Sequence, residues 1–442
     1  MTVKRSVRRE VVLALGAALV VGGGAARADQ GADAFATLGW PASTKSAQTR
    51  GQLKVFVEPR GRGGTFGEIG PGVRLDVTEV VASKDRCQAW LHIAPRGWIC
   101  AADTRASDEP PIPTERPRHA GRALLGEYAD IRSGGADAFD SVTDVRVGQP
   151  RERLSSAMFV VLKAPVTVDG ERYYRTDQGL VASERLMRKT ASEFAGVDLV
   201  ASPPPTWPMG WASPHEKKTP LVVRDRPSAD GAIVETLAKH AIIPILGRQG
   251  DFVQVGEGEW IDARDTRIAR TTAPPWGVLP DERWIDVDLE EQVLVAYEGT
   301  RPVFATLVAT AGKKFVTPVG VWRIGDKDTK RRMRNSDESR ASWNVADVPF
   351  VMGFRKWYAL HGAYWHDGFG RPRSHGCVNL SPADAQEMFG WTRPAVPAGW
   401  TFVEDDGHGT PIRIRNSRHP TPSWRGMEGE ILGPSTPPAT GA

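Results

Sequence analysis

The sequence predicts a mainly β, multidomain protein in which small β-barrels precede a β-sandwich. Three observations predict this class. Short runs of β-branched and aromatic residues alternate with Gly and Pro turns along most of the chain. Pro-rich stretches at 107–119, 201–214 and 271–282 divide it into segments. Within the last segment only 381–391 reads as a helix, with Ser381 as its N-cap and Pro382 as its first helical residue.

The chain begins with a predicted export signal. Basic residues within 4–9 precede an apolar run at 11–21, and Ala26-Arg27-Ala28 fits a cleavage site. We therefore expect residues 1–28 to be removed and the protein to be exported to the periplasm or cell envelope. An uncleaved anchor is the alternative, although the apolar run is short for a membrane span.

The charge balance argues against a polyanionic partner. The chain has 57 Lys and Arg against 53 Asp and Glu, and the segment 1–28 holds five of these bases and one of the acids. The remainder is therefore close to neutral, which predicts no nucleic-acid binding and no attraction to anionic membranes. No second apolar stretch is long enough to span a bilayer.

An internal repeat follows the signal. "GWICAADTR" (97–105) resembles "EWIDARDTR" (259–267), and each closes a segment of short predicted strands. Both segments resemble bacterial SH3-like modules, which predicts such modules at 45–106 and 218–270. "YYRTDQGLVASERL" indicates a more divergent module within 119–200.

The chain has three cysteines. Cys87 and Cys100 bracket one short segment, and the oxidising space outside the cytoplasm favours a disulfide between them. Two free buried thiols are the alternative. Pairing these two leaves Cys377 as the odd cysteine, which in an exported chain indicates an intermolecular bond or a working thiol.

The segment from residue 282 onward has a different pattern of predicted strands. Residues 283–312 predict a strand, a hairpin turn at Glu298-Gly299 and two further strands, and 317–327 continues as another strand. We expect a β-sandwich over 282–404. The Gly-, Pro- and Ser-rich residues 405–442 predict a flexible tail.

Cys377 lies in a setting that suits a nucleophile. A thiol must be activated by a nearby base to attack an amide. His361 ends a predicted strand, and the residues after it form a loop that would return its imidazole to the sulfur. Gly376 permits close backbone approach, and the N–H groups of Gly376 and Cys377 are expected to face a developing oxyanion.

The stretch "HGAYWHDGFGRPRSHGCVNLS" resembles the active-site motif of the L,D-transpeptidases, which remodel peptidoglycan. His361-Gly362 and Ser374-His375-Gly376-Cys377 match its two halves, followed by Asn379. "VATAGKKFVTPVGVWRI" resembles the strand pair upstream in that family. The resemblance covers about residues 282 to 404.

The resemblance implies roles for several residues. Cys377 would be the nucleophile and His361 the base that forms a thiolate–imidazolium pair with it. The Gly362 carbonyl would hold the His361 ring, and His375 would support the loop. The residues expected to contact substrate or to line its cleft are Asn379, Ser374, Tyr358, Tyr364, Trp365 and Arg373. The chemistry would need no metal or cofactor, and the partner would be peptidoglycan.

Several alternatives stay open. The thioester could pass to an amine as a crosslink, to water, to a free D-amino acid, or to a protein that is attached to the wall. A non-catalytic wall-binding protein is a further alternative, and so are a zinc site from His361, His366 and Cys377 and a purely structural thiol. By analogy the SH3-like modules would tether the enzyme to peptidoglycan.

Overall fold

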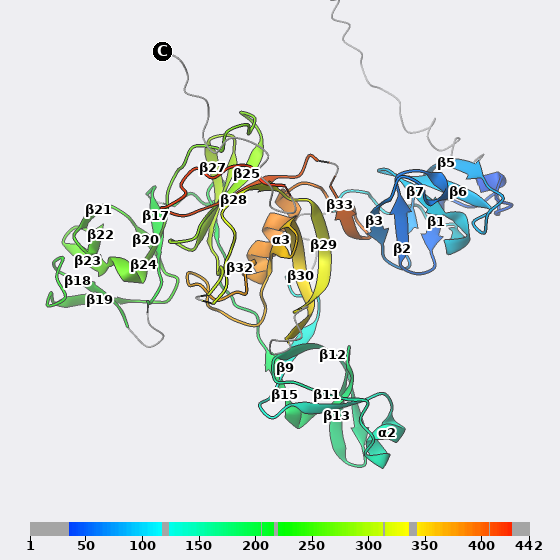
Figure 1. Cartoon of the computed structure of the whole chain (residues 1–442), viewed down its shortest axis with the longest axis horizontal. Coiled ribbons are helices and arrows are strands. Elements are labelled where there is room, and N and C mark those ends of the chain that lie inside the picture. The colour runs from blue at the N-terminus through cyan, green and yellow to red at the C-terminus, as the bar shows by residue number, and fades with distance from the viewer. Residues whose placement is uncertain are drawn as a thin grey trace, which may run out of the picture.

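The computed structural model describes residues 35–116, 123–204, 206–215, 220–312, 314–335, 343–405 and 407–426. The predicted signal, 1–28, lies outside them. Three small β units surround a larger central β-sandwich (Figure 1). Within the described residues, no helix is long and apolar enough to cross a membrane. The mainly β, multidomain class predicted from the sequence is confirmed.

The first unit is closed by a disulfide between Cys87 and Cys100. Its strands are β1 (Ser46–Thr49), β2 (Leu53–Phe56), β3 (Thr65–Ile69), β4 (Arg74–Leu75), β5 (Val77–Ala82), β6 (Ala89–Ile93), β7 (Trp98–Cys100) and β8 (Thr104–Ser107). Strand β3 also pairs antiparallel with β33 (Trp400–Glu404) of the sandwich. The first unit therefore extends a sheet of the sandwich.

The second unit is similarly joined to the sandwich. It contains β9 (Glu127–Ile131), β10 (Ala136–Phe139), α2 (Val142–Val147), β11 (Glu152–Leu154), β12 (Met158–Val168), β13 (Glu171–Thr176), β14 (Gly179–Ala182) and β15 (Leu186–Lys189). The start of β12 pairs in parallel with the start of β30 (Asn344–Arg355). Tyr128 of β9 stacks on Tyr364 of the sandwich, with ring centroids 3.9 Å apart.

The third unit begins earlier than the sequence predicts. Its strands are β17 (Met209–Ala212), β18 (Leu221–Arg224), β19 (Ile233–Leu237), β20 (Ile242–Pro244), β21 (Gly247–Gln249), β22 (Phe252–Gly256), β23 (Glu259–Asp262) and β24 (Thr266–Ala269). Strand β17 falls in the predicted linker 201–214, yet it pairs with β20 and β24. Trp211 of this strand is completely buried, in a core that it shares with Val293 and Leu307 of the sandwich.

The three units end alike. In each, a strand leads through a 3-10 turn into a last strand, with turns at Ala101–Asp103, Ser183–Arg185 and Ala263–Asp265. Thr104 and Thr266 each donate a hydroxyl hydrogen bond to the first carbonyl of the turn before them. This shared ending explains the repeated "DTR" residues. An SH3-like fold for the units stays a prediction.

The sandwich consists of two sheets and one helix. The first sheet has the order β16 (Val197–Asp198), β27 (Arg301–Leu307), β26 (Val293–Glu298), β25 (Arg283–Asp288), β34 (Pro411–Arg415) and β28 (Gly320–Arg323). The second runs β33, β29 (Asp326–Arg334), β30, β31 (Tyr358–Gly362) and β32 (Val378–Leu380). Helix α3 (Pro382–Trp391) begins after Ser381, whose side chain accepts from the Asp384 N–H. The predicted cap and the predicted hairpin after Glu298 are thus confirmed.

One apolar core joins the two sheets and α3. It includes Ile285 and Leu294 from the first sheet, Leu360 and Val378 from the second, and Met388 from the helix, all of them buried. Because strand side chains alternate between faces, Ala359, His361, Cys377 and Asn379 lie on the opposite face of β31 and β32. The core thus fixes which residues face the catalytic side.

Two predicted boundaries are wrong because short strands complete the first sheet. Residues 197–198, placed in the second unit, form β16 and pair with β27. Residues 411–415, placed in the flexible tail, form β34 between β25 and β28. Ile412 and Ile414 are buried in the core, which holds this segment in place.

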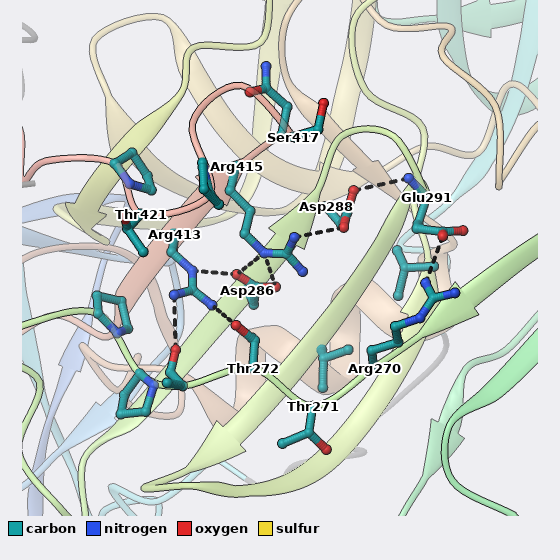
Figure 2. A pocket seen from close by; sticks show the side chains of 18 of the residues that line it. Arg270, Thr271, Thr272, Asp286, Asp288, Glu291, Arg413, Arg415, Ser417 and Thr421 are labelled. Carbon is teal, nitrogen blue, oxygen red and sulfur yellow. Dashed lines mark hydrogen bonds and ion pairs between the residues drawn. The ribbon is translucent and has the colours of Figure 1, made fainter. Parts of the chain in front are cut away.

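Charged side chains fix the outer face of β34. Arg413 Nε donates to Asp286 at 2.6 Å, and Arg415 binds both Asp286 and Asp288 (Figure 2). These residues and Trp276 line a cavity of about 590 Å³ between the sheet, the linker after β24 and the C-terminal segment. The cavity contains neither His361 nor Cys377, and its charged groups bind one another.

Candidate active site

Two neighbouring parallel strands bring His361 and Cys377 together. Strands β31 and β32 pair with Leu360 opposite Val378 and His361 opposite Asn379. Cys377 directly precedes β32, so it lies beside Ala359 on the face that carries His361. The loop 363–376, which connects these strands, therefore returns Cys377 to the face of the sheet that carries His361.

His361 is oriented by its own strand. The side chain is buried, and its Nδ1 lies 3.2 Å from the carbonyl oxygen of Gly362. A carbonyl can only accept, so the Nδ1 nitrogen carries the proton and Nε2 keeps a free lone pair. Burial lowers the pKa of His361 to about 4. The ring is therefore neutral near neutral pH and can accept a proton at Nε2.

Cys377 is half-buried and rests as a thiol. Its Sγ lies 3.7 Å from the carbonyl oxygen of Trp357. Burial raises the pKa of this thiol, although the Ala359 backbone hydrogen bond and the charge of Arg331 act against that rise. Burial disfavours the charged form of both side chains. The thiolate–imidazolium pair that the resemblance implies stays a prediction.

Ser374 shapes the turn before the nucleophile. Its hydroxyl accepts the Gly376 N–H at 3.0 Å and donates to the Cys377 carbonyl at 2.5 Å. The hydroxyl of Thr317 donates to the Gly376 carbonyl at 2.8 Å. The expectation that the Gly376 N–H faces an oxyanion is therefore wrong, because Ser374 uses this donor. Of the two expected donors, the Cys377 N–H remains.

Gly376 is required by both conformation and space. Its φ is +144°, and a Cβ there would lie 2.7 Å from Cε1 of Tyr358 and 3.3 Å from the Val316 carbonyl. We expect Gly376→Ala to destabilise the fold by about 1–3 kcal/mol and to lower turnover at least tenfold, because the turn must shift. Thermal unfolding and steady-state kinetics measure both effects. Gly51→Ala, in open space, is the control, and equal behaviour of the two variants would contradict the prediction.

Three other predicted residues lie around this turn. The Tyr358 ring covers Gly376 and stacks with the guanidinium of Arg355, 5.4 Å away. His375 lies between the rings of Phe315 and Trp343, at centroid distances of 4.4 and 5.2 Å. These contacts make His375 a support for the loop. Arg373 is exposed, and its side chain lies against Gly368.

The two aromatic residues Trp365 and Tyr364, both predicted to line the substrate cleft, lie in different surroundings. Trp365 is partly buried, with its ring 5.7 Å from that of His361. Tyr364 is fully buried, donates its hydroxyl to the Ala346 carbonyl at 2.8 Å and stacks on Tyr128. Its predicted contact with substrate is therefore wrong, because the second unit covers it.

The sequence analysis missed a structural role for His366. Its Nδ1 accepts the Gly368 N–H at 3.1 Å, and its Nε2 lies 2.9 Å from the side-chain amide of Asn379. The Asn379 atom beside Nε2 is the amide nitrogen Nδ2, so the ring and the amide are hydrogen-bonded to each other. Asn379, predicted to contact substrate or to bond within the site, is thus held by the loop. Asn379 lies opposite His361 in the parallel pair of β31 and β32. This position would have indicated that Asn379 belongs to the site, but the sequence alone does not give the strand register.

Among the described residues, no group of three His, Cys, Asp or Glu side chains is arranged to hold a metal ion. The zinc alternative would need His366 as a ligand. Both of its ring nitrogens are already bonded, to Gly368 and to Asn379. The geometry instead provides a thiol and an oriented, neutral imidazole on adjacent strands.

Known proteins match the same part of the chain. Residues 282–414 match the YkuD family, described as the L,D-transpeptidase catalytic domain. This part of the chain carries the L,D-transpeptidase catalytic domain. The match extends beyond residue 404 because it includes most of β34. The comparison with curated proteins gives no match.

Solved structures of L,D-transpeptidases are similar to part of this chain. The catalytic domain from Enterococcus faecium is 22% identical over 30% of this chain and 98% of its own, with a TM-score of 0.25. The Stackebrandtia nassauensis enzyme is 23% identical over 31% of this chain and 57% of its own, with a TM-score of 0.23. L,D-transpeptidase 3 from Mycobacterium tuberculosis is 14% identical over 36% of this chain and 73% of its own, with a TM-score of 0.25. The domain assignment rests on the family match.

Proposed function

We propose that the protein is an exported L,D-transpeptidase that forms 3-3 crosslinks in peptidoglycan. Sγ of Cys377 attacks the carbonyl between the third residue of a stem tetrapeptide and its terminal D-Ala. His361 Nε2 takes the thiol proton and then gives it to the departing D-Ala amine. The observation that carries the proposal is the His361 ring, which the Gly362 carbonyl orients and burial keeps neutral, on the strand beside Cys377.

The second half of the reaction uses the same groups in reverse. The side-chain amine of a diamino acid in a neighbouring stem attacks the thioester, and His361 accepts the proton that this amine loses. The amide bond forms as the C–S bond breaks, and the proton returns to sulfur. The Cys377 N–H would stabilise the oxyanion of both tetrahedral intermediates.

Mass spectrometry of protein and products tests this proposal. The mature enzyme and its Cys377→Ala variant are mixed with disaccharide-tetrapeptide. We expect a wild-type adduct that lacks one D-Ala, followed by crosslinked dimers, and neither product with the variant. An adduct followed only by tripeptide would make the enzyme a carboxypeptidase. The absence of any adduct or product would overturn the proposal.

The pH profile is a further expected result. His361 must be unprotonated to act as a base, and its pKa of about 4 keeps it so above that pH. We expect kcat/KM to stay level through mildly acidic pH and to fall as the pH drops through about 4. Steady-state rates on soluble tetrapeptide measure this, with unfolding monitored at each pH. A half-maximal rate near pH 6.5 would contradict the buried, neutral base.

A further inference from the structure

Three side chains of the third unit bind the loop that connects the catalytic strands. Lys239 Nζ donates to the Asp367 carboxylate at 2.5 Å, and His240 Nε2 lies 3.2 Å from the Phe369 carbonyl oxygen. Arg267 Nε donates to the Gly370 carbonyl at 2.6 Å. We call Lys239, His240 and Arg267 the clamp.

The clamp is tightly packed against the loop. A Cβ at Gly370 would lie 2.7 Å from the Ser213 hydroxyl and 3.5 Å from Cγ of Arg267, so the loop backbone packs directly against these side chains. The Phe194 ring, in the segment before β16, contacts both His240 and Phe369, at 4.6 and 5.8 Å. The Lys239–Asp367 pair alone is half-exposed and would contribute little. Lys239 Nζ also donates to the Asp367 carbonyl, so all three clamp residues contact backbone carbonyls of the loop, and these contacts give the clamp its geometry.

The clamped residues lead directly to the catalytic strand. Asp367, Phe369 and Gly370 follow His366, which binds Asn379 in β32. On the other side of the clamp, Gly370 N–H donates to the Val308 carbonyl, and Ser374 N–H donates to the Thr310 carbonyl. The loop therefore connects the clamp residues both to the turn before Cys377 and to strand β32 after it.

We propose that Lys239, His240 and Arg267 are positioning residues for the catalytic centre, because they fix the loop that places Asn379 and Cys377. This inference rests on the proposed function, and it changes the role expected for the third unit. A unit that only tethered the enzyme to the wall would be dispensable on a soluble substrate. A unit that positions the loop is needed there as well.

The test uses the full-length protein and two probes. Lys239→Ala, Arg267→Ala and the double variant are compared with Arg248→Ala, which changes an exposed arginine of the same unit whose described hydrogen bond is to Gly250. The first probe is kcat and KM on soluble disaccharide-tetrapeptide. The second is the rate at which iodoacetamide alkylates Cys377, the free cysteine. Thermal unfolding shows that each variant is folded.

We expect the double variant to lose roughly ten- to a hundredfold in kcat, with a smaller change in KM, because misplacing catalytic atoms by an ångström has effects of this size. The alkylation rate of the double variant should differ from that of the wild type. Lys239→Arg should recover the wild-type kcat and alkylation rate that Lys239→Ala loses. Arg248→Ala should behave as wild type. Wild-type kcat and alkylation in the folded double variant would overturn the inference. If the wild type itself gives no adduct with tetrapeptide, the proposed function fails, and the alkylation comparison still decides on the clamp.

Discussion

Replacing His361 by alanine is expected to slow acylation of Cys377 by about 10³-fold. Burial raises the pKa of the thiol, so little thiolate exists near neutral pH without a base. The base that the geometry offers is the neutral His361 ring, which Gly362 orients on the adjacent strand. General-base catalysis contributes about 10²–10⁴-fold in enzymes, and residues that act as a unit are lost together. The adduct rate with disaccharide-tetrapeptide, followed by mass spectrometry, measures the effect.

His375→Ala is the matched control for this variant. His375 is the other histidine of the motif, but its ring lies between Phe315 and Trp343. We expect its loss to loosen the turn and to change the acylation rate by only a few-fold. Should His375→Ala abolish acylation while His361→Ala retains it, the assignment of the base would be reversed.

The sequence predicts the chemistry of the site better than its surroundings. The placement of Cys377 and His361 on neighbouring segments could be predicted because their spacing and neighbours are local. Tyr364 could not be placed, because the residue that buries it, Tyr128, comes from another unit. The use of the Gly376 N–H by Ser374 depends on one side-chain rotamer, and no residue pattern specifies it.

The domain boundaries are also mispredicted where a segment packs against residues that are distant in the sequence. Residues 201–214 and 405–442 are rich in Pro and Gly, which local propensity assigns to linkers and tails. Trp211 and Ile414 nevertheless become buried, because the strands that accept β17 and β34 lie far away in the sequence. The short polar stretch that contains Arg413 and Arg415 resembles a solvated tail until Asp286 is placed beside it.

Asp286→Ala is expected to have the largest effect on stability, about 3–5 kcal/mol. Asp286 and Arg413 are both nearly inaccessible, with 3% of each side chain exposed, and their atoms are 2.6 Å apart. Removing the carboxylate leaves the Arg413 charge buried without its counter-ion, and this is costly in a low-dielectric setting. Arg415 also loses its contacts with Asp286. Chemical denaturation measures the free energy of unfolding.

Two further variants separate the charge effect from the packing effect. Asp288→Ala removes a more exposed carboxylate, which binds Arg415 and accepts the N–H groups of Glu290 and Glu291, and should cost less than Asp286→Ala, about 1–2 kcal/mol. The double variant Asp286→Leu with Arg413→Met removes both buried charges and keeps apolar volume, so it should recover much of the lost stability. A loss below 1 kcal/mol for Asp286→Ala would instead mean that Thr272 and the Ala273 carbonyl, which also bind Arg413, suffice to hold its charge.

The location of this pair makes the stability loss informative about the whole sandwich. Strand β34 lies between β25 and β28, so its release would separate β28 from the rest of the first sheet. His361 and Cys377 lie on the second sheet, whose other face shares a core with this one. If the sandwich unfolds as one unit, Asp286→Ala should lower the denaturation midpoint of activity and of tryptophan fluorescence equally. If β34 alone detaches, fluorescence should change at lower denaturant concentration than activity, and the C-terminal strand would be an independent closing element of the domain.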